Sequence, residues 1–168
     1  PYMTSDLPGI GGTLKSECKD FIVEEVPSYL PGGTGEHTYC LLEKENLSTF
    51  EAIRKLSGAL GVSRGEFGYA GLKDRKGVTR QWVSVRGVSP ADVQGLALGG
   101  LTLRQVTRHT NKLRVGHLRG NRFEVWVRGV HADAADRVPR VLQQVAQRGI
   151  PNYYGLQRFG IRGYAHRI

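Results

Sequence analysis

The chain has 168 residues, of which 39% are apolar, and its 24 Lys and Arg residues outnumber 15 Asp and Glu residues, leaving a net charge of +9. A chain of this length and composition is expected to bury the core of one globular domain, which excludes collagen-like, mucin-like and disordered proteins. No apolar run reaches the roughly 18 residues that cross a bilayer, and two separate cysteines provide neither a disulfide framework nor a zinc site, so we expect a soluble, cytoplasmic protein with reduced thiols.

The first part of the chain predicts two strands followed by a helix. Residues 20–26 (DFIVEEV) and 37–45 (HTYCLLEKE) are rich in β-branched or aromatic residues and are separated by Pro and Gly residues. Ser48 and Glu51 have the spacing of a capping box, which begins a helix, and Gly61 ends it. Apolar residues recur on one face of this helix: Ile53, Leu56 and Leu60.

The second part returns to short strands and adds two helices. The predicted strands are 67–71 (FGYAG), 80–86 (RQWVSVR), 101–106 (LTLRQV) and 122–130 (RFEVWVRGV). Residues 89–98 (SPADVQGLAL) predict a short helix. Asp136 is expected to cap a last helix that tolerates Pro139 in its first turn and ends before Gly149. The buried stripe of that helix is expected to be Val138, Val141, Leu142 and Val145.

Strands and helices alternate along the chain without a βαβ repeat. This pattern predicts an α+β fold with a largely antiparallel sheet and helices on one side.

Positive charge is concentrated in the second part of the chain. Residues 1–60 carry five basic and nine acidic groups, whereas residues 104–122 carry six Lys or Arg, two His and no carboxylate. Such a stretch would attract a polyanion, and nucleic acid is the natural partner. A solvated basic surface without a ligand is the alternative, and composition alone does not separate the two. A membrane-surface helix is disfavoured, because the basic residues follow no helical period.

One carboxylate, Asp74, lies among the cations Lys73, Arg75 and Lys76 in the segment LKDRKGVT. Nearby positive charge keeps a carboxylate ionised, so Asp74 could serve as a nucleophile or a base. In the alternative interpretation the segment is a polar hairpin tip in which Asp74 shapes a turn. The sequence lacks a P-loop and a dinucleotide fingerprint, and its five histidines are scattered, so we expect no cofactor and no metal.

A second dense segment, residues 150–160 (IPNYYGLQRFG), combines three aromatic rings with an Asn, a Gln and an Arg. These groups supply stacking faces, amides and a guanidinium fork, which together can hold an unstacked nucleic-acid base. Core packing of the aromatic rings is the alternative.

Taken together, FGYAGLKDRKGVTRQW and PNYYGLQRFG resemble the two most characteristic motifs of the TruD family of tRNA pseudouridine synthases. RHTNKLRVGHLRGNRF resembles the family's basic strand–turn–strand segment, and LKSECKDFIVEEV with GEHTYCLLEKENLST resembles its N-terminal part. The resemblance runs in order over essentially the whole chain. It implies the pseudouridine synthase catalytic-domain fold, and conversion of uridine to pseudouridine in tRNA without a cofactor. The target it implies is uridine 13.

The resemblance also implies roles for single residues. Asp74 matches the family's catalytic aspartate, as nucleophile or as base, and Lys15 in GTLKSE matches a basic position near that aspartate. Asn152 and Tyr154 are candidates for holding a uridine that has left the RNA stack. Arg158 is either a structural fork or an RNA contact.

Further candidates lie in the strands around the Asp74 segment and in the basic segment. Thr79 and Gln81 are candidate substrate-site residues, because they could support the Asp74 loop. In the alternative interpretation both are ordinary strand residues without a functional role. Three basic residues are candidates for RNA binding: Lys112, Arg114 and Arg119.

The sequence departs from the family pattern in two ways. Tyr154 stands where bacterial members usually have Phe, and a Tyr ring stacks as a Phe ring does. Family members also continue through an inserted domain and a return to the catalytic domain. Residues 1–168 are therefore expected to be the N-terminal part of a catalytic domain, from a protein that is monomeric at full length. The alternative is a basic RNA-binding or RNA-chaperone module without catalysis, or an inactive fragment.

Overall fold

A computed structural model describes residues 3–151, and the contacts within it divide the chain into two units. We call Thr13–Arg128 the sheet unit, and Pro1–Gly12 with Gly129–Ile168 the terminal unit. The strands are β1 (Gly11–Leu14), β2 (Phe21–Pro27), β3 (His37–Glu45), β4 (Phe67–Tyr69), β5 (Val78–Arg86), β6 (Leu101–His109), β7 (Leu118–Val125) and β8 (Val127–Val130). The helices are α1 (Thr49–Leu60), α2 (Pro90–Gln94) and α3 (Ala134–Arg148), with 3-10 turns at Cys18–Asp20 and Arg64–Glu66.

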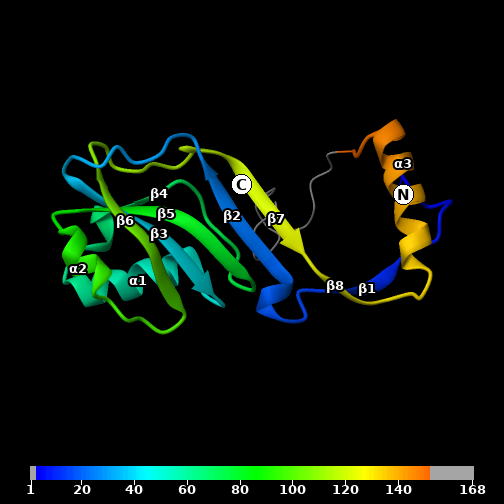
Figure 1. Ribbon diagram of the computed structural model, residues 1–168, viewed down its shortest axis with the longest axis horizontal. Coiled ribbons are helices and arrows are strands. Elements are labelled where there is room, and N and C mark those ends of the chain that lie inside the picture. Colours follow the sequence, from blue (N-terminus) through cyan, green and yellow to red (C-terminus); the bar gives the residue numbers. More distant parts are fainter. Residues whose placement is uncertain (1–2, 152–168) are drawn as a thin grey trace, which may run out of the picture. The chain divides into compact units, whose positions relative to one another are not determined.

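The sheet unit is built on one six-stranded sheet (Figure 1). Its main path is β6-β3-β5-β2-β7, with β4 also paired to β5, and a separate two-stranded sheet joins β1 and β8. Only β2 and β5 pair in parallel; every other pair in the six-stranded sheet is antiparallel. The prediction of an α+β fold with a largely antiparallel sheet is therefore confirmed.

The central strand β5 changes its neighbour halfway along. Its first residues, Val78–Arg80, pair with β2, whereas Val83–Val85 pair with β4. Since β3 occupies the other side of β5 along its whole length, β2 and β4 share one side in succession. The β4–β5 connection, residues 70–77, starts beside this change of partner and runs to the beginning of β5.

Alternate residues of β3 and β5 build a separate apolar cluster on each face of the sheet. On one face Leu42 and Val83 pack against α1 and Val93 of α2, so both helices of the sheet unit cover the same side (Figure 1). On the other face Tyr39 and Trp82 pack against residues of two loops, Ala70 and Leu113.

Local signals define the ends of α1. The Ser48 side chain accepts a hydrogen bond from the Glu51 amide, and the Glu51 carboxylate accepts one from the Ser48 amide. Gly61 follows the last turn in the left-handed conformation, with φ 66°. The predicted capping box and stop signal are both confirmed.

Several predicted boundaries in the second part of the chain were wrong. The strand expected at 122–130 begins earlier and is divided by Trp126 into β7 and β8, and the helix expected at 89–98 is confined to Pro90–Gln94. The first strand, Gly11–Leu14, had no predicted counterpart. In the described part of the chain no helix is long and apolar enough to span a membrane.

In the terminal unit, α3 begins before its predicted cap. The backbone is helical from Ala134, so Asp136 lies inside the first turn and Pro139 falls in the second turn. The helix does end before Gly149, as predicted. The apolar stripe was only partly predicted, because Leu142 is 60% exposed.

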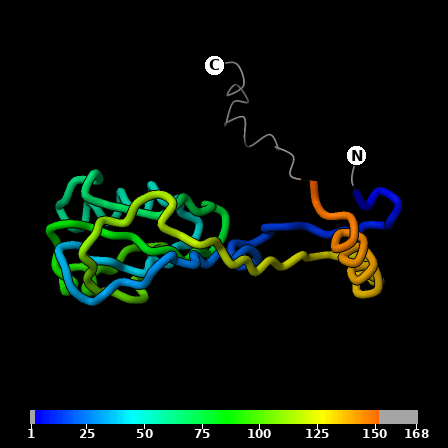
Figure 2. The backbone as a smooth tube through the Cα atoms, turned by 90° about the horizontal axis from the view of Figure 1, so that it is seen from above, coloured from blue at the N-terminus to red at the C-terminus, as the bar shows by residue number. Residues whose placement is uncertain are grey.

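The N-terminal segment runs beside α3 (Figure 2). The Gln144 amide donates to the Met3 carbonyl and to the Asp6 carboxylate, at 2.9 and 2.7 Å. Apolar side chains of both segments line a shared groove: Leu7, Ile10, Val138, Val141 and Leu142.

Candidate active site

Asp74 lies in the β4–β5 connection and is in contact with Lys15. The Lys15 ammonium is 3.1 Å from Oδ1 of Asp74 and 3.7 Å from the centre of the Phe21 ring. The two charged side chains are 31% and 47% exposed, so residues 3–151 do not by themselves shield the Asp74 carboxylate from solvent. The Lys15 ammonium therefore contacts both the Asp74 carboxylate and the Phe21 ring, at a partly exposed position of the sheet unit.

The backbone at Lys15 adopts the left-handed conformation, with φ 55°. A residue with a Cβ atom reaches this region at a cost, and such residues gather at functional sites, where the surrounding structure holds them. The left-handed backbone of Lys15 therefore supports a functional role for this residue beside Asp74.

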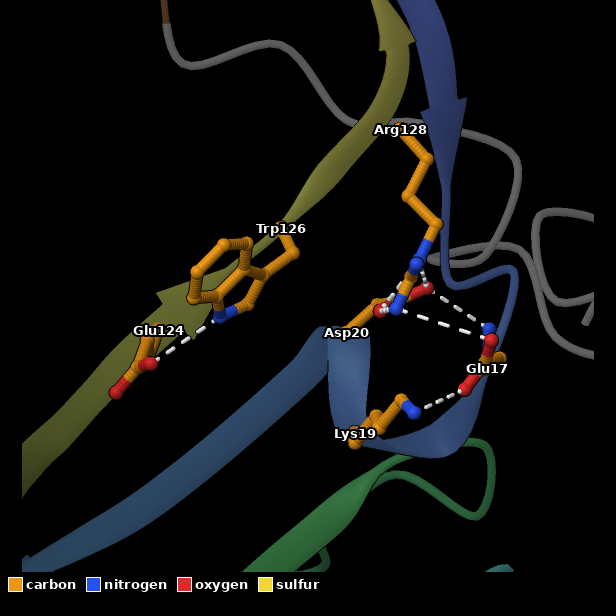
Figure 3. A network of polar contacts seen from close by, with 6 residues as sticks. All are labelled: Glu17, Lys19, Asp20, Glu124, Trp126 and Arg128. Atoms are coloured by element: carbon orange, nitrogen blue, oxygen red, sulfur yellow. Dashed lines mark hydrogen bonds and ion pairs between the residues drawn. The ribbon is translucent and has the colours of Figure 1, made fainter.

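A network around the buried carboxylate of Asp20 holds the segment that follows Lys15 (Figure 3). The Arg128 guanidinium donates two-pronged hydrogen bonds of 2.6 to 2.8 Å to the carboxylate of Asp20, which lies just before β2. The Glu17 amide donates to the same carboxylate, and the Trp126 amide donates to the Asp20 carbonyl. The Arg128 hydrogen bonds lower the pKa of Asp20 to about 2. These contacts tie the chain after Lys15 to the end of β7.

A buried lysine, Lys44, holds the loop that carries Asp74 through hydrogen bonds to its backbone. Its ammonium donates hydrogen bonds to the carbonyls of Leu47, Asp74 and Lys73, at 2.5, 2.7 and 3.4 Å. The Lys44 residue is 1% exposed. Burial is the largest cause that lowers its pKa, to about 8. Two of its three hydrogen bonds end on the backbone of the Asp74 loop, so Lys44 helps to set the position of that loop.

Two further buried side chains complete this support. The Thr49 hydroxyl accepts a hydrogen bond from the Lys73 amide and donates one to Oε1 of Gln81. The Gln81 amide nitrogen in turn donates to the Gly71 carbonyl. The loop is thus held at residues 71, 73 and 74.

An ion pair fills the place where β5 exchanges β2 for β4. The Lys73 ammonium lies 2.6 Å from the Glu25 carboxylate, and both side chains are almost fully buried. The other Glu25 oxygen accepts a hydrogen bond from the Trp82 amide, which β2 no longer pairs with at this point. Removing either partner would leave an uncompensated buried charge, so Lys73 and Glu25 stabilise this part of the sheet only when both are present.

The remaining sequence-predicted residues have different positions. Thr79 and Gln81 are completely buried in β5, so neither side chain is accessible to a substrate in this structure. Gln81 does contact the Asp74 loop, which is the partner role that we considered for it. Lys112 and Arg114 lie in the β6–β7 connection, and Arg119 is exposed on β7. Asn152, Tyr154 and Arg158 lie outside the described residues.

Sequence reasoning missed Lys44, Thr49 and Glu25. One signal was available for Lys44, because strand alternation puts it on the same face as the buried Leu42, where a charge is unusual. Among residues 3–151 no three His, Cys, Asp or Glu side chains gather in the way that metal ligands do.

Comparison with known proteins identifies the family. A family model described as tRNA pseudouridine synthase D (TruD) matches residues 1–168. The chain is 50% identical over 167 residues to the tRNA pseudouridine synthase D of Geobacter sulfurreducens, a match that covers 99% of this chain and 41% of that relative. It is 49% identical over 164 residues to the Thermus thermophilus protein of the same name, covering 97% of this chain and 46% of the relative.

A solved structure agrees with these matches. A crystal structure of a Methanosarcina mazei protein, given as tRNA pseudouridine synthase D (TruD), superimposes with a TM-score of 0.88 at 31% identity and covers 95% of this chain and 37% of that one. The chain thus spans less than half the length of these relatives. Because the family match extends over all 168 residues, the chain belongs to the tRNA pseudouridine synthase D (TruD) family.

Proposed function

We propose that this chain is the N-terminal part of a tRNA pseudouridine synthase catalytic domain, and that Asp74 is its catalytic carboxylate. The observation that carries the proposal is the 3.1 Å contact between Asp74 and Lys15 in a loop held by buried side chains. In this proposal the family's inserted domain and return segment complete the cleft. The whole protein acts as a monomer in the cytoplasm, and its substrate is tRNA.

The proposed reaction rearranges uridine without a change of oxidation state. The bond between C1′ of the ribose and N1 of the uracil breaks, the uracil turns, and a bond from C1′ to C5 forms. The C5 hydrogen leaves as a proton, and N1 takes up a proton. An ionised carboxylate beside the ribose can act as a nucleophile on C1′ or as a base, and either role suits Asp74 beside the Lys15 ammonium.

The target uridine must leave the RNA stack to reach Asp74. Unstacking costs a few kcal/mol, which stacking and hydrogen bonds in the pocket have to offset. We assign these contacts to Tyr154 and Asn152, with Arg158 as a further RNA contact. By family resemblance the target is uridine 13.

Basic residues of the sheet unit bind the RNA backbone in this proposal. Lys112, Arg114 and Arg119 belong to the segment that lacks carboxylates and carries the densest positive charge. Phosphate contacts position an RNA without reading its sequence.

Tritium release from C5-labelled uridine in a tRNA transcript tests the role of Asp74 in the intact protein. Asp74→Asn keeps the shape of the side chain but removes its charge, and we expect it to slow a single turnover by about 10²–10⁴-fold. Asp136→Asn makes the same change at an exposed aspartate of α3 and should leave the rate as it is.

Lys15 variants separate charge from backbone conformation. Asn tolerates the left-handed region, so Lys15→Asn removes the ammonium with little strain, and we expect a slower turnover that Lys15→Arg partly restores. Unchanged tritium release by Asp74→Asn would show that another group carries the reaction. If the intact wild-type protein binds tRNA and releases no tritium, the hypothesis of an RNA-binding module replaces that of an enzyme.

A further inference from the structure

The β6–β7 connection forms a polar cavity in the sheet unit, separate from the Asp74 loop. The cavity has a volume of about 490 Å³, within the range of about 300–1,000 Å³ that is typical of ligand sites. Its lining residues are His37, Thr110, Asn111, Lys112, Arg114 and His117. Two of them are permanent cations, two are imidazoles, and none is a carboxylate, so the cavity suits an anion.

Four contacts hold the wall of this cavity, residues 110–117, in one conformation. The Leu113 amide donates to the Ser84 hydroxyl at 3.0 Å, and the Tyr39 hydroxyl donates to the Asn111 carbonyl at 2.8 Å. The Gly116 amide donates to the Ala70 carbonyl, and Nδ1 of His117 is 2.9 Å from the Tyr29 hydroxyl. A wall that is ordered before binding loses little conformational entropy when a ligand arrives.

Gly68 permits the close approach of this wall to the sheet. A Cβ atom at Gly68 would collide with the Leu113 carbonyl and lie 2.6 Å from the Ser84 hydroxyl. The strand β4 can therefore support residues 110–117 only with glycine at this position.

His37 is a mostly buried residue in the lining of the cavity. The residue is 9% exposed, and its Nδ1 atom has no hydrogen-bond partner in the described part of the chain. Burial and the positive charges of Arg86 and Lys112 lower the pKa of His37. The nearby carboxylate of Glu36 is engaged by Arg86 at 3.2 Å. A buried polar atom without a partner is uncommon, and because this atom is out of solvent contact we assign it no contact with the ligand.

The cavity lies at the opposite end of β3 from the Asp74 loop. His37 begins the strand, whereas Lys44, which binds the Asp74 carbonyl, is seven residues further on. At about 3.3 Å per residue the two ends are about 23 Å apart. The same nucleotide cannot occupy both places, so a ligand of the cavity is either a distant part of an RNA or a separate small anion.

We propose that this cavity binds a backbone phosphate of the RNA substrate, several nucleotides away from the uridine at Asp74. The proposal rests on the proposed function in one respect, namely that the substrate is RNA. Arg114 contributes the main contact, because its exposed guanidinium has no carboxylate partner among residues 3–151 and can present two donors to a phosphate. Lys112 is less free, since its ammonium already donates to the Gly65 carbonyl.

Filter binding of a tRNA transcript to the intact protein over a salt series tests the proposal. Arg114→Gln should weaken binding about tenfold and reduce the slope of log affinity against log salt by about one, the change expected for one lost phosphate contact. Arg114→Lys keeps the charge and should retain most of the slope. Circular dichroism checks that each variant is folded.

Arg54→Gln is the matched control. It makes the same change at an exposed arginine of α1, on the face of the sheet opposite to Tyr39 and His37, and should leave affinity and slope as they are. If Arg54→Gln and Arg114→Gln have equal effects, or if neither has any, the cavity is not an RNA-phosphate site and the proposal is overturned.

Uridine 5′-monophosphate distinguishes a backbone phosphate from a free nucleotide. We expect it to compete with tRNA weakly and equally for the wild type and for Arg114→Gln. Strong competition that disappears in Arg114→Gln would assign the cavity to a mononucleotide and overturn the proposal. Binding is measured without turnover, so an Arg114-dependent salt slope in a protein that releases no tritium would support this proposal while contradicting the proposed function.

Discussion

At the scale of single residues, Lys44 is an ammonium buried without a carboxylate partner in the described residues. Its three hydrogen bonds end on backbone carbonyls, and burial lowers its pKa to about 8. A buried cation costs free energy unless its partners compensate. Lys44 lies on the helix-covered face of β3, and its hydrogen bonds connect that strand to the loop carrying Asp74.

The lowered pKa predicts a specific dependence of stability on pH. Between about pH 8 and the ordinary lysine value of 10.5, the unfolded chain binds a proton at Lys44 that the folded chain has lost. The free energy of unfolding should therefore rise with pH across this window, by up to about 3 kcal/mol from this group. Urea unfolding at pH 7 to 10.5 measures it.

Lys44→Met provides the comparison, because it lacks the titrating group but has a similar length. The variant should be less stable at pH 7, since three carbonyls lose their donor. The difference between the two stability curves isolates Lys44 from Cys40 and Tyr39, whose pKa values are raised by burial. A constant difference from pH 7 to 10.5 would mean that Lys44 keeps an ordinary pKa.

At the scale of elements, the start of α1 links helix formation to the candidate site. Ser48 caps the helix, and the next residue, Thr49, contacts both Lys73 and Gln81 through its hydroxyl. The cap therefore determines where the Thr49 hydroxyl lies beneath the Asp74 loop. The turn before α1, which local residues define, thereby helps to position the Asp74 loop more than twenty residues further along the chain.

Ser48→Ala should lower the free energy of unfolding by about 1 kcal/mol, because the Glu51 amide loses its side-chain acceptor. Ser48→Gly is the matched control and should cost only a few tenths of that, since glycine suits a cap position. Chemical denaturation of both variants measures the difference. Equal losses would mean that the hydroxyl contributes nothing beyond the backbone conformation.

At the scale of the whole molecule, the described residues form two units with separate apolar contacts. The sheet unit has clusters on both faces of its sheet, whereas the terminal unit relies on the groove between α3 and the N-terminal segment. Units with separate cores can open independently, and the one with fewer buried contacts opens first.

Val141→Asp tests this independence, because it introduces a charge into the groove of the terminal unit. Hydrogen exchange should show faster exchange of the amides of α3, while those of β3 and β5 keep the protection of the wild type. Faster exchange throughout β3 and β5 would show that the two units unfold together.

Local signals in the sequence were sufficient for the elements whose ends depend on neighbouring residues. The strand at 37–45 and the helix after Ser48 were predicted with the observed bounds, because alternation, a capping box and Gly61 act over a few residues. At α3 the same kind of signal was ambiguous, since Asp133 and Asp136 both suit a helix start, and the observed backbone is helical from Ala134.

The sequence by itself determined the α+β class, the family and the candidacy of Asp74 and Lys15, since these depend on short motifs and residue patterns. Only the tertiary structure decided how the Asp74 loop is held and where the basic cavity lies. Lys44 and Glu25 contact Asp74 and Lys73, which lie far from them in the chain, and His37 lines a cavity with residues of the β6–β7 connection. Such contacts depend on register and on the exchange of β2 for β4 beside β5, which no local pattern encodes.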